Sequence, residues 1–144
     1  VFFMNGHGGN TASINAGFFE AYARAPRLVD GGDDLRCVCA EWWHTPSAQA
    51  LSTELFGDRD GDHASASEVS VAAAAYPDHV KKAEMAADPP PSTHVFGPAD
   101  FRRRYPEGRM GSYPALASVD AGQRIVGAVA ADLVKQYREF VTEE

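Results

Sequence analysis

The sequence is short of basic residues and of long apolar runs, and each shortage excludes a class of function. Acidic residues outnumber basic ones by 20 to 13, and the formal net charge of -7 disfavours a nucleic-acid partner. No apolar run approaches the roughly 20 residues that a membrane helix needs, so no membrane partner is expected. No charged and then apolar leader opens the sequence, and we therefore expect a cytoplasmic protein.

Cysteine is also scarce. The two cysteines, Cys37 and Cys39, alternate with Val38 in an apolar run, which places both thiols on one face of a strand. Two such residues without a second cysteine pair are a weak zinc signal and do not predict a disulfide. We therefore interpret them as buried thiols.

The 144 residues are enough for one domain, and a single domain over residues 1–144 is expected. Val1 already lies in the strand-like run VFFM, with no initiator methionine and no turn before it. We therefore expect the chain to be the C-terminal part of a longer protein.

The first half of the sequence has the pattern strand, helix, strand. VFFM reads as a short strand with both faces covered, and the glycines of NGHGGN end it. A helix capped by Asn10 or Thr11 should follow and close at Pro26. LRCVCAEWW then predicts a parallel second strand, so the fold class is α/β, a parallel sheet flanked by helices.

Three more helices are predicted further along. One begins at Thr45-Pro46 and stops near Gly57. Ser65 and Glu68 have the spacing of a capping box before an alanine-rich helix that Pro77 ends. Residues 78–114 form an irregular excursion with a short strand at residues 94–96, and an amphipathic helix runs from about Asp120 to Val141.

The turn NGHGGN is the first candidate site. It follows the carboxyl end of a strand, where ligands collect in open α/β sheets. Gly6, Gly8 and Gly9 leave room around His7 for a metal or a substrate. The alternative is a glycine turn with an incidental solvent-facing histidine.

Other glycine motifs do not fit this turn. The chain has no G-x-S-x-G elbow and no Gly-Lys-Ser/Thr phosphate loop. Thr11 stands where G-x-G-x-x-G needs its third glycine. A histidine that seeks further ligands remains the interpretation.

GDHASASEVS, residues 61–70, is the second candidate. Asp62, His63 and Glu68 gather at the start of the alanine-rich helix, where His63 could act as a neutral base or proton shuttle. In the alternative, Glu68 only caps the helix and Asp62 is a solvated loop acid.

Trp42 and Trp43 end the second strand and could wall a pocket over a flat substrate, or belong to a core or subunit interface.

VFFMNGHGGN, GDHASASEVS and GSYPALASVDAG before the last helix resemble, in order and rough spacing, the creatininase (creatinine amidohydrolase) family. The resemblance spans nearly the whole chain and implies a three-layer creatininase-like fold, truncated at its N-terminus. It implies His7 as a ligand of a divalent metal, zinc first, with manganese or iron as alternatives. It matches His63 and Glu68 to the histidine and glutamate of the family's helix-opening segment, and with the neighbouring Asp62 these are the expected catalytic residues. The residues expected to bind substrate are Asn5, Gly8, Gly9, Asn10, Trp42 and Trp43.

The implied activity is metal-dependent hydrolysis of a C–N bond in a small cyclic amide or formamide. The metal would activate water, and His63 would protonate the leaving nitrogen. Creatinine itself is not expected, because the family's creatinine hydrolases use two well-separated tryptophans and Trp42 and Trp43 are adjacent. The resemblance also implies a homo-oligomer, by family habit a hexamer.

Two departures from the family pattern bear on activity. Ser65 replaces the usual glycine, and Ser70 follows Val69 where threonine-serine is common. The E-x-H strand motif and the aspartate that supply most metal ligands have no counterpart, and one histidine cannot hold a catalytic metal. We therefore expect the 144-residue chain alone to bind zinc or manganese weakly and to lack amidase activity. The alternative is a non-catalytic chain that keeps the fold for binding or assembly.

Overall fold

The structure is a computed structural model that describes residues 1–81, 83–85 and 87–143. The chain divides into two compact units, one formed by Val1–Pro46 with Val129–Glu144 and the other by Ser47–Ala128. The prediction of a single domain is not tested by this division and stays a prediction. None of the described helices has the length and apolar character needed to cross a membrane.

The first unit holds the strand, helix, strand pattern that the sequence predicts. Strands β1 (Phe2–Asn5) and β2 (Val38–Glu41) pair in parallel, with Phe2 opposite Val38 and Asn5 opposite Glu41. Helix α1 (Thr11–Leu28) connects them. The two apolar segments VFFM and VCA therefore pair side by side, although a whole helix separates them in the sequence.

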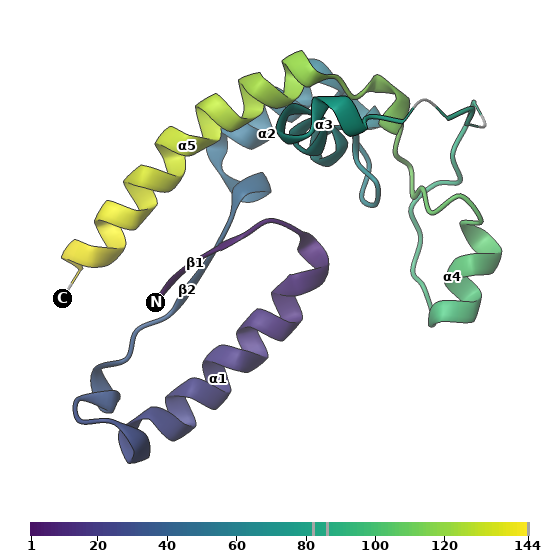
Figure 1. Ribbon diagram of the computed structural model, residues 1–144. Coiled ribbons are helices and arrows are strands. Elements are labelled where there is room, and N and C mark those ends of the chain that lie inside the picture. The colour runs from purple at the N-terminus through teal and green to yellow at the C-terminus, as the bar shows by residue number, and fades with distance from the viewer. Residues whose placement is uncertain (82, 86, 144) are drawn as a thin grey trace. The chain divides into compact units, whose positions relative to one another are not determined.

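Helices lie on either side of the strand pair in this unit (Figure 1). From α1, the Tyr22 hydroxyl donates to Cys37 O at 3.2 Å and accepts from Cys37 N at 3.0 Å. From the C-terminal part of α5 (Val119–Thr142), the rings of Tyr137 and Phe140 lie 5.4 and 5.8 Å from the Phe2 ring. The unit is therefore α/β with a parallel sheet between helices, as predicted.

Two expectations about burial in this unit are wrong. Phe3 and Met4 are 43% and 65% exposed, because in the described residues the sheet has two strands and leaves part of β1 uncovered. Cys37 and Cys39 are half-buried rather than buried, although burial, with a smaller contribution from the Glu41 charge, still raises the pKa of the Cys39 thiol.

The ends of α1 also differ from expectation. The helix continues through Pro26 to Leu28, because a proline in the last turn removes only one of its hydrogen bonds. Asn10 precedes the helix but its side chain makes no cap hydrogen bond and donates instead to Asn5 Oδ1 at 3.4 Å.

The second unit is built from α2 (Pro46–Leu55), α3 (Ala66–Ala75), α4 (Pro98–Arg104) and the first part of α5. Helices α3 and α5 approach closely, since a Cβ added to Gly122 would lie 1.9 Å from Ser70 O. Ser70 Oγ donates to Ala66 O and accepts from Ser118 N at 3.1 Å. Ile125 is fully buried in the core of this unit.

The predicted helices of this unit are confirmed at α2, α3 and α5, but the excursion differs. Residues 94–96 form no strand, because side chains already satisfy the neighbouring backbone: Phe96 N donates to Asp100 Oδ2 and Thr93 N to the Tyr105 hydroxyl. The unpredicted helix α4 follows, with Pro98 in its first turn.

Short 3-10 turns join the elements, at Gly8–Asn10, Gly32–Asp34, Trp42–His44, Gly57–Arg59, Pro77–His79 and Pro114–Leu116.

Candidate functional site

The predicted site residues fall into two groups, one in each unit. The first group begins with Asn5, the last residue of β1, which is 2% exposed. Its Nδ2 donates to Thr11 Oγ1 at 3.2 Å and to Glu41 Oε1 at 3.4 Å. Its Oδ1 accepts from His7 N at 3.1 Å and from Asn10 Nδ2. One buried amide therefore shapes the whole NGHGGN turn.

The glycines of the turn make room for neighbouring rings. A Cβ on Gly9 would lie 2.9 Å from His7 Nε2, so the imidazole lies against the backbone of Gly9. A Cβ on Gly8 would lie 3.9 Å from Trp43 Cζ2. A Cβ on Gly6 would meet nothing within 4 Å. Gly9 is thus the position of the turn where a side chain would displace the His7 ring.

Trp42 and Trp43 lie beside this turn, which the order of the two parallel strands brings about. Trp42 Nε1 donates to Gly6 O at 3.2 Å, and the two indole rings meet edge to face at 5.9 Å. Both side chains are half-buried. The structure therefore brings His7 and the tryptophans into one group, as a pocket wall would need.

Glu41, the last residue of β2, belongs to this group and was missed from the sequence. Its carboxylate is 14% exposed, accepts from Thr11 Oγ1 and lies 2.9 Å from His44 Nδ1. A signal was present, because Glu41 ends a predicted parallel strand at the same edge as His7. In the sequence, Glu41 lies inside the apolar run LRCVCAEWW, which hides this position.

The metal donors of the described residues do not form a catalytic set. Among residues 1–81, 83–85 and 87–143, no group of three or more His, Cys, Asp or Glu side chains could hold a metal ion. Structural and catalytic zinc sites use three or four protein ligands. The donor set of this chain therefore does not fit a catalytic metal by itself.

The second group centres on His63, whose backbone is held by the segment around Met110. Asp62 N donates to Met110 O at 3.2 Å and Met110 N to His63 O at 3.5 Å, an antiparallel bridge. The Ser112 hydroxyl also donates to His63 O. Ala64, the next residue, has a φ of 56°, a left-handed conformation that costs a non-glycine residue energy.

The side chains of this group differ in their surroundings. His63 and Asp62 are exposed, and Glu68 is half-buried in the first turn of α3. Ser65 Oγ accepts from Glu68 N at 3.2 Å, which confirms Ser65 as the N-cap. The helix start therefore has a structural role whatever its chemistry.

Asp60, rather than Asp62, is the carboxylate that binds the α3 N-terminus. Its oxygens accept from Ser67 N at 2.7 Å and Ser67 Oγ at 2.8 Å, and from the Ser52 hydroxyl of α2. A carboxylate there is favoured by the positive end of the helix dipole. Sequence reasoning missed this residue because it lies outside the capping-box spacing.

A cavity of about 720 Å³ opens in the same unit. Ala64 lines it, together with Val69 and Ala73 of α3 and with Val119. Cavities of this size commonly bind small molecules. Among the described residues, His63, Asp62 and Glu68 are not part of its lining.

A parallel strand pair between helices, with polar side chains gathered at the carboxyl ends of the strands, defines an α/β protein of the kind that binds ligands at a sheet edge. Residues 1–137 match the creatininase family, described as creatinine amidohydrolase, and the chain belongs to this family. This confirms the resemblance seen in the sequence, and the family description points to hydrolase activity.

Solved structures show the same fold. A creatininase with one tryptophan replaced by phenylalanine has 25% identity and a TM-score of 0.73, over 96% of this chain and 55% of that one. A second such mutant, of a creatininase described as Type II, has 24% identity and a TM-score of 0.70 over the same shares. This chain therefore spans 55% of their length. No match was found among curated proteins.

Proposed function

We propose that the complete protein carrying this chain is a metal-dependent amidohydrolase that cleaves a C–N bond in a small cyclic amide or formamide. Membership of the creatininase family supports the reaction class. The observation that carries the proposal is His63, whose backbone is fixed by Met110 and Ser112 while its imidazole is exposed. A general acid needs this combination of a fixed position and access to substrate.

In such a reaction, water adds to the amide carbonyl and the C–N bond breaks as the nitrogen gains a proton. His63 is the proposed donor of that proton, with Asp62 and Glu68 as neighbouring carboxylates of the same segment. The proposed substrate contacts are in the first unit, where Gly8 and Trp43 lie together and Asn5 and Asn10 shape the turn.

The proposed metal is zinc, with manganese or iron as alternatives, and His7 is one ligand. The support is the family membership and the exposed His7 imidazole, which lies against the backbone of Gly9. Because the described residues hold no three-donor group, we propose that the other ligands belong to parts of the complete protein outside this sequence.

A comparison of two histidine variants tests the catalytic proposal. His63→Ala in the complete protein should lower turnover by about 10²- to 10⁴-fold, the usual contribution of a positioned acid or base. Bound metal and melting temperature should barely change. His94→Ala is the matched control, since His94 lies in the same unit and contacts Phe96 instead. An active His63→Ala enzyme would exclude the role, and a complete protein without any amidase activity would favour the binding or assembly alternative.

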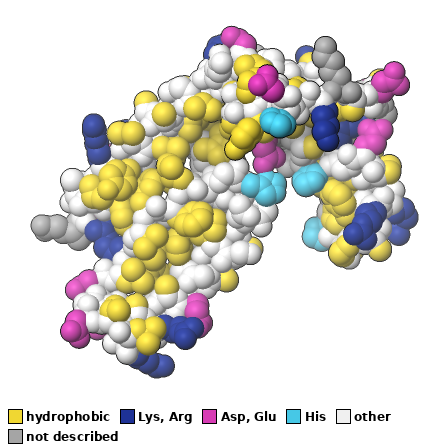
Figure 2. Space-filling view, in the orientation of Figure 1, with side chains coloured by type: hydrophobic (Ala, Val, Ile, Leu, Met, Phe, Trp, Pro, Cys, Tyr) yellow, Lys and Arg dark blue, Asp and Glu magenta, His cyan; other side chains and the backbone are white. Residues whose placement is uncertain are grey.

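We also propose a cytoplasmic homo-oligomer, by family habit a hexamer. Hydrophobic side chains gather over α1 on the face in view (Figure 2), and Phe19 and Leu28 of this helix are 74% and 69% exposed. Exposed apolar patches commonly mark protein interfaces. Light scattering of the complete protein tests this proposal: Phe19→Glu should shift the mass toward the monomer, and a monomeric wild type would contradict it.

A further inference from the structure

The Phe101 ring of α4 meets the His63 imidazole edge to face, with ring centroids 5.4 Å apart and an interplanar angle of 86°. We propose that Phe101 is a positioning residue that holds the imidazole in the orientation from which it gives up its proton. The inference rests on the proposed function, because it assigns a task to the surroundings of His63.

His63 needs such a contact. Its backbone is fixed through Met110 and Ser112, but its exposed side chain still has two rotatable bonds. Among the described residues, no hydrogen bond reaches the imidazole nitrogens, which leaves both nitrogens to a substrate. An aromatic ring can restrict rotation without occupying a nitrogen, since edge-to-face pairs have a preferred geometry.

Phe101 is itself held from behind. The Tyr105 ring lies 5.4 Å from it, and Tyr105 is 2% exposed. The Tyr105 hydroxyl accepts from Thr93 N at 2.9 Å and lies 3.0 Å from Pro91 O, to which it donates. Phe101 therefore packs between the His63 ring and the buried, hydrogen-bonded Tyr105, which restricts the position of the Phe101 ring.

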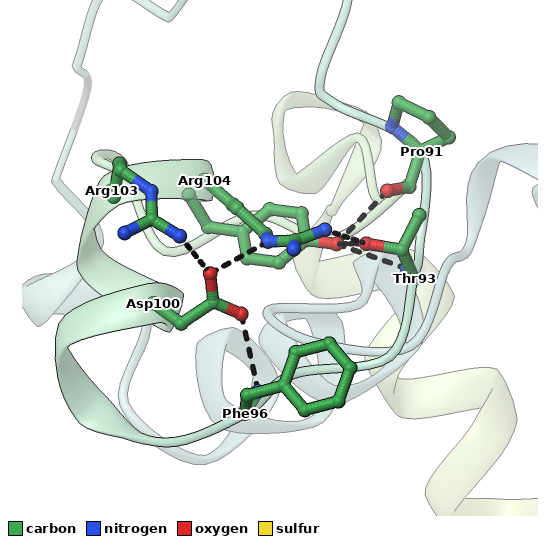
Figure 3. Close-up of polar contacts among 7 residues, drawn as sticks. Pro91, Thr93, Phe96, Asp100, Arg103 and Arg104 are labelled. Carbon is green, nitrogen blue, oxygen red and sulfur yellow. Dashed lines mark hydrogen bonds and ion pairs between the residues drawn. The ribbon is translucent and has the colours of Figure 1, made fainter.

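Asp100 fixes the helix that carries Phe101 (Figure 3). Its carboxylate accepts from Phe96 N at 3.1 Å and from Arg104 Nε at 2.9 Å, and it pairs with Arg103. Helix α4 has seven residues, too few to be stable without tertiary contacts. These contacts therefore give Phe101 a defined place from which to hold His63.

The test combines spectra and kinetics of the complete protein. In Phe101→Leu, the histidine ring signals of His63, observed with ¹³C-labelled histidine, should lose their ring-current shift. Turnover, kcat, should fall by about 10- to 100-fold with KM little changed, because a misplaced acid affects the chemical step. Phe101→Tyr keeps the ring and should restore both.

Phe96→Leu is the matched control. Phe96 makes the same kind of contact with His94, at 4.8 Å, and its backbone N–H to Asp100 survives the substitution. It should move the His94 signals and leave those of His63 and kcat unchanged. A Phe101→Leu variant with unmoved His63 signals, or with moved signals and full kcat, would overturn the inference.

The two proposals fail differently. If His63→Ala stays active, or the wild type hydrolyses no amide, the proposed function fails and the positioning role fails with it, whatever the spectra show. If His63→Ala is inactive while Phe101→Leu turns over normally, the positioning role alone fails. If Phe101→Leu lowers the melting temperature and kcat together while the His63 signals stay in place, Phe101 is a packing residue only.

Discussion

Asn5 and Glu41 lie directly opposite each other at the carboxyl ends of β1 and β2, and Asn5 Nδ2 donates to Glu41 Oε1 at 3.4 Å. If β1 slipped by one residue against β2, the Asn5 side chain would turn to the other face of the sheet, away from Glu41. The strand register therefore determines the geometry of the turn that holds His7. Any test of the first group should disturb the ring of His7 while leaving this register intact.

Gly9→Ala is such a test. A Cβ at this position would lie 2.9 Å from His7 Nε2, and the flexible imidazole can move away at little cost in stability. We expect an unchanged melting temperature, a shifted His7 ring signal and a lower metal content in the complete protein. Gly6→Ala is the control, because its Cβ meets nothing within 4 Å. Equal metal content in the two variants would argue against His7 as a ligand.

The sequence predicted best those elements whose boundaries are set by their own residues. Helix α3 starts after the capping Ser65 and α2 at Pro46, as expected, because caps and prolines act locally. The strand expected at residues 94–96 is wrong because Asp100 and Tyr105, later in the chain, bind that backbone. Tertiary contacts of this kind leave no periodic signal.

The candidate site was predictable to the same extent. Parallel pairing of two apolar runs was enough to bring His7 and the tryptophans together. Glu41 and Asp60 were missed, since their roles depend on partners across the strand pair and on α2 and α3. Phe101 could not be predicted, because its contact with His63 needs α4 to be in place.

Ser65 allows the cap to be separated from any chemistry at His63. Ser65 Oγ accepts from Glu68 N at 3.2 Å and lies 3.2 Å from Ser67 Oγ. Ser65→Ala should lower the free energy of unfolding by about 0.5–2 kcal/mol, and Ser65→Gly by only a few tenths. Urea denaturation measures both. Equal losses of unfolding free energy in Ser65→Ala and Ser65→Gly would show that the hydroxyl contributes nothing as a cap. If Ser65→Ala lost as much turnover as His63→Ala, the cap and the chemistry at His63 would not be independent.

Asp100 should make stability depend on pH. Hydrogen bonds from Arg104 first, and then from Phe96 N, hold the pKa of the Asp100 carboxyl below its usual range. A depressed pKa in the folded state stabilises the protein above the unfolded value of about 3.9, and this contribution is lost as pH falls through the folded pKa.

Asp100→Asn should therefore melt at a lower temperature than the wild type at pH 7, and the difference should shrink below about pH 4. Asp88→Asn is the control, because Asp88 is exposed. Thermal melts across this pH range measure both variants. A difference that grows as the pH falls would contradict the assigned ion pairs.

Alanine substitutions at Gly61 and Gly108 test the close packing of the loop that carries His63, because the two glycines have the same backbone conformation but different surroundings. Both have left-handed φ values, 75° and 76°, so alanine should cost each about 1–2 kcal/mol of backbone strain. At Gly108 the added Cβ meets nothing within 4 Å, whereas at Gly61 it would lie 2.5 Å from backbone atoms of Ser112. Since backbone cannot rotate away, Gly61→Ala must push apart the two segments whose bridge holds His63 and Met110.

We expect Gly108→Ala to lose only the strain energy and to keep turnover in the complete protein. Gly61→Ala should lose clearly more stability and most of its turnover. Equal unfolding free energies for the two variants would show that the close approach of Gly61 to Ser112 does not exist in solution.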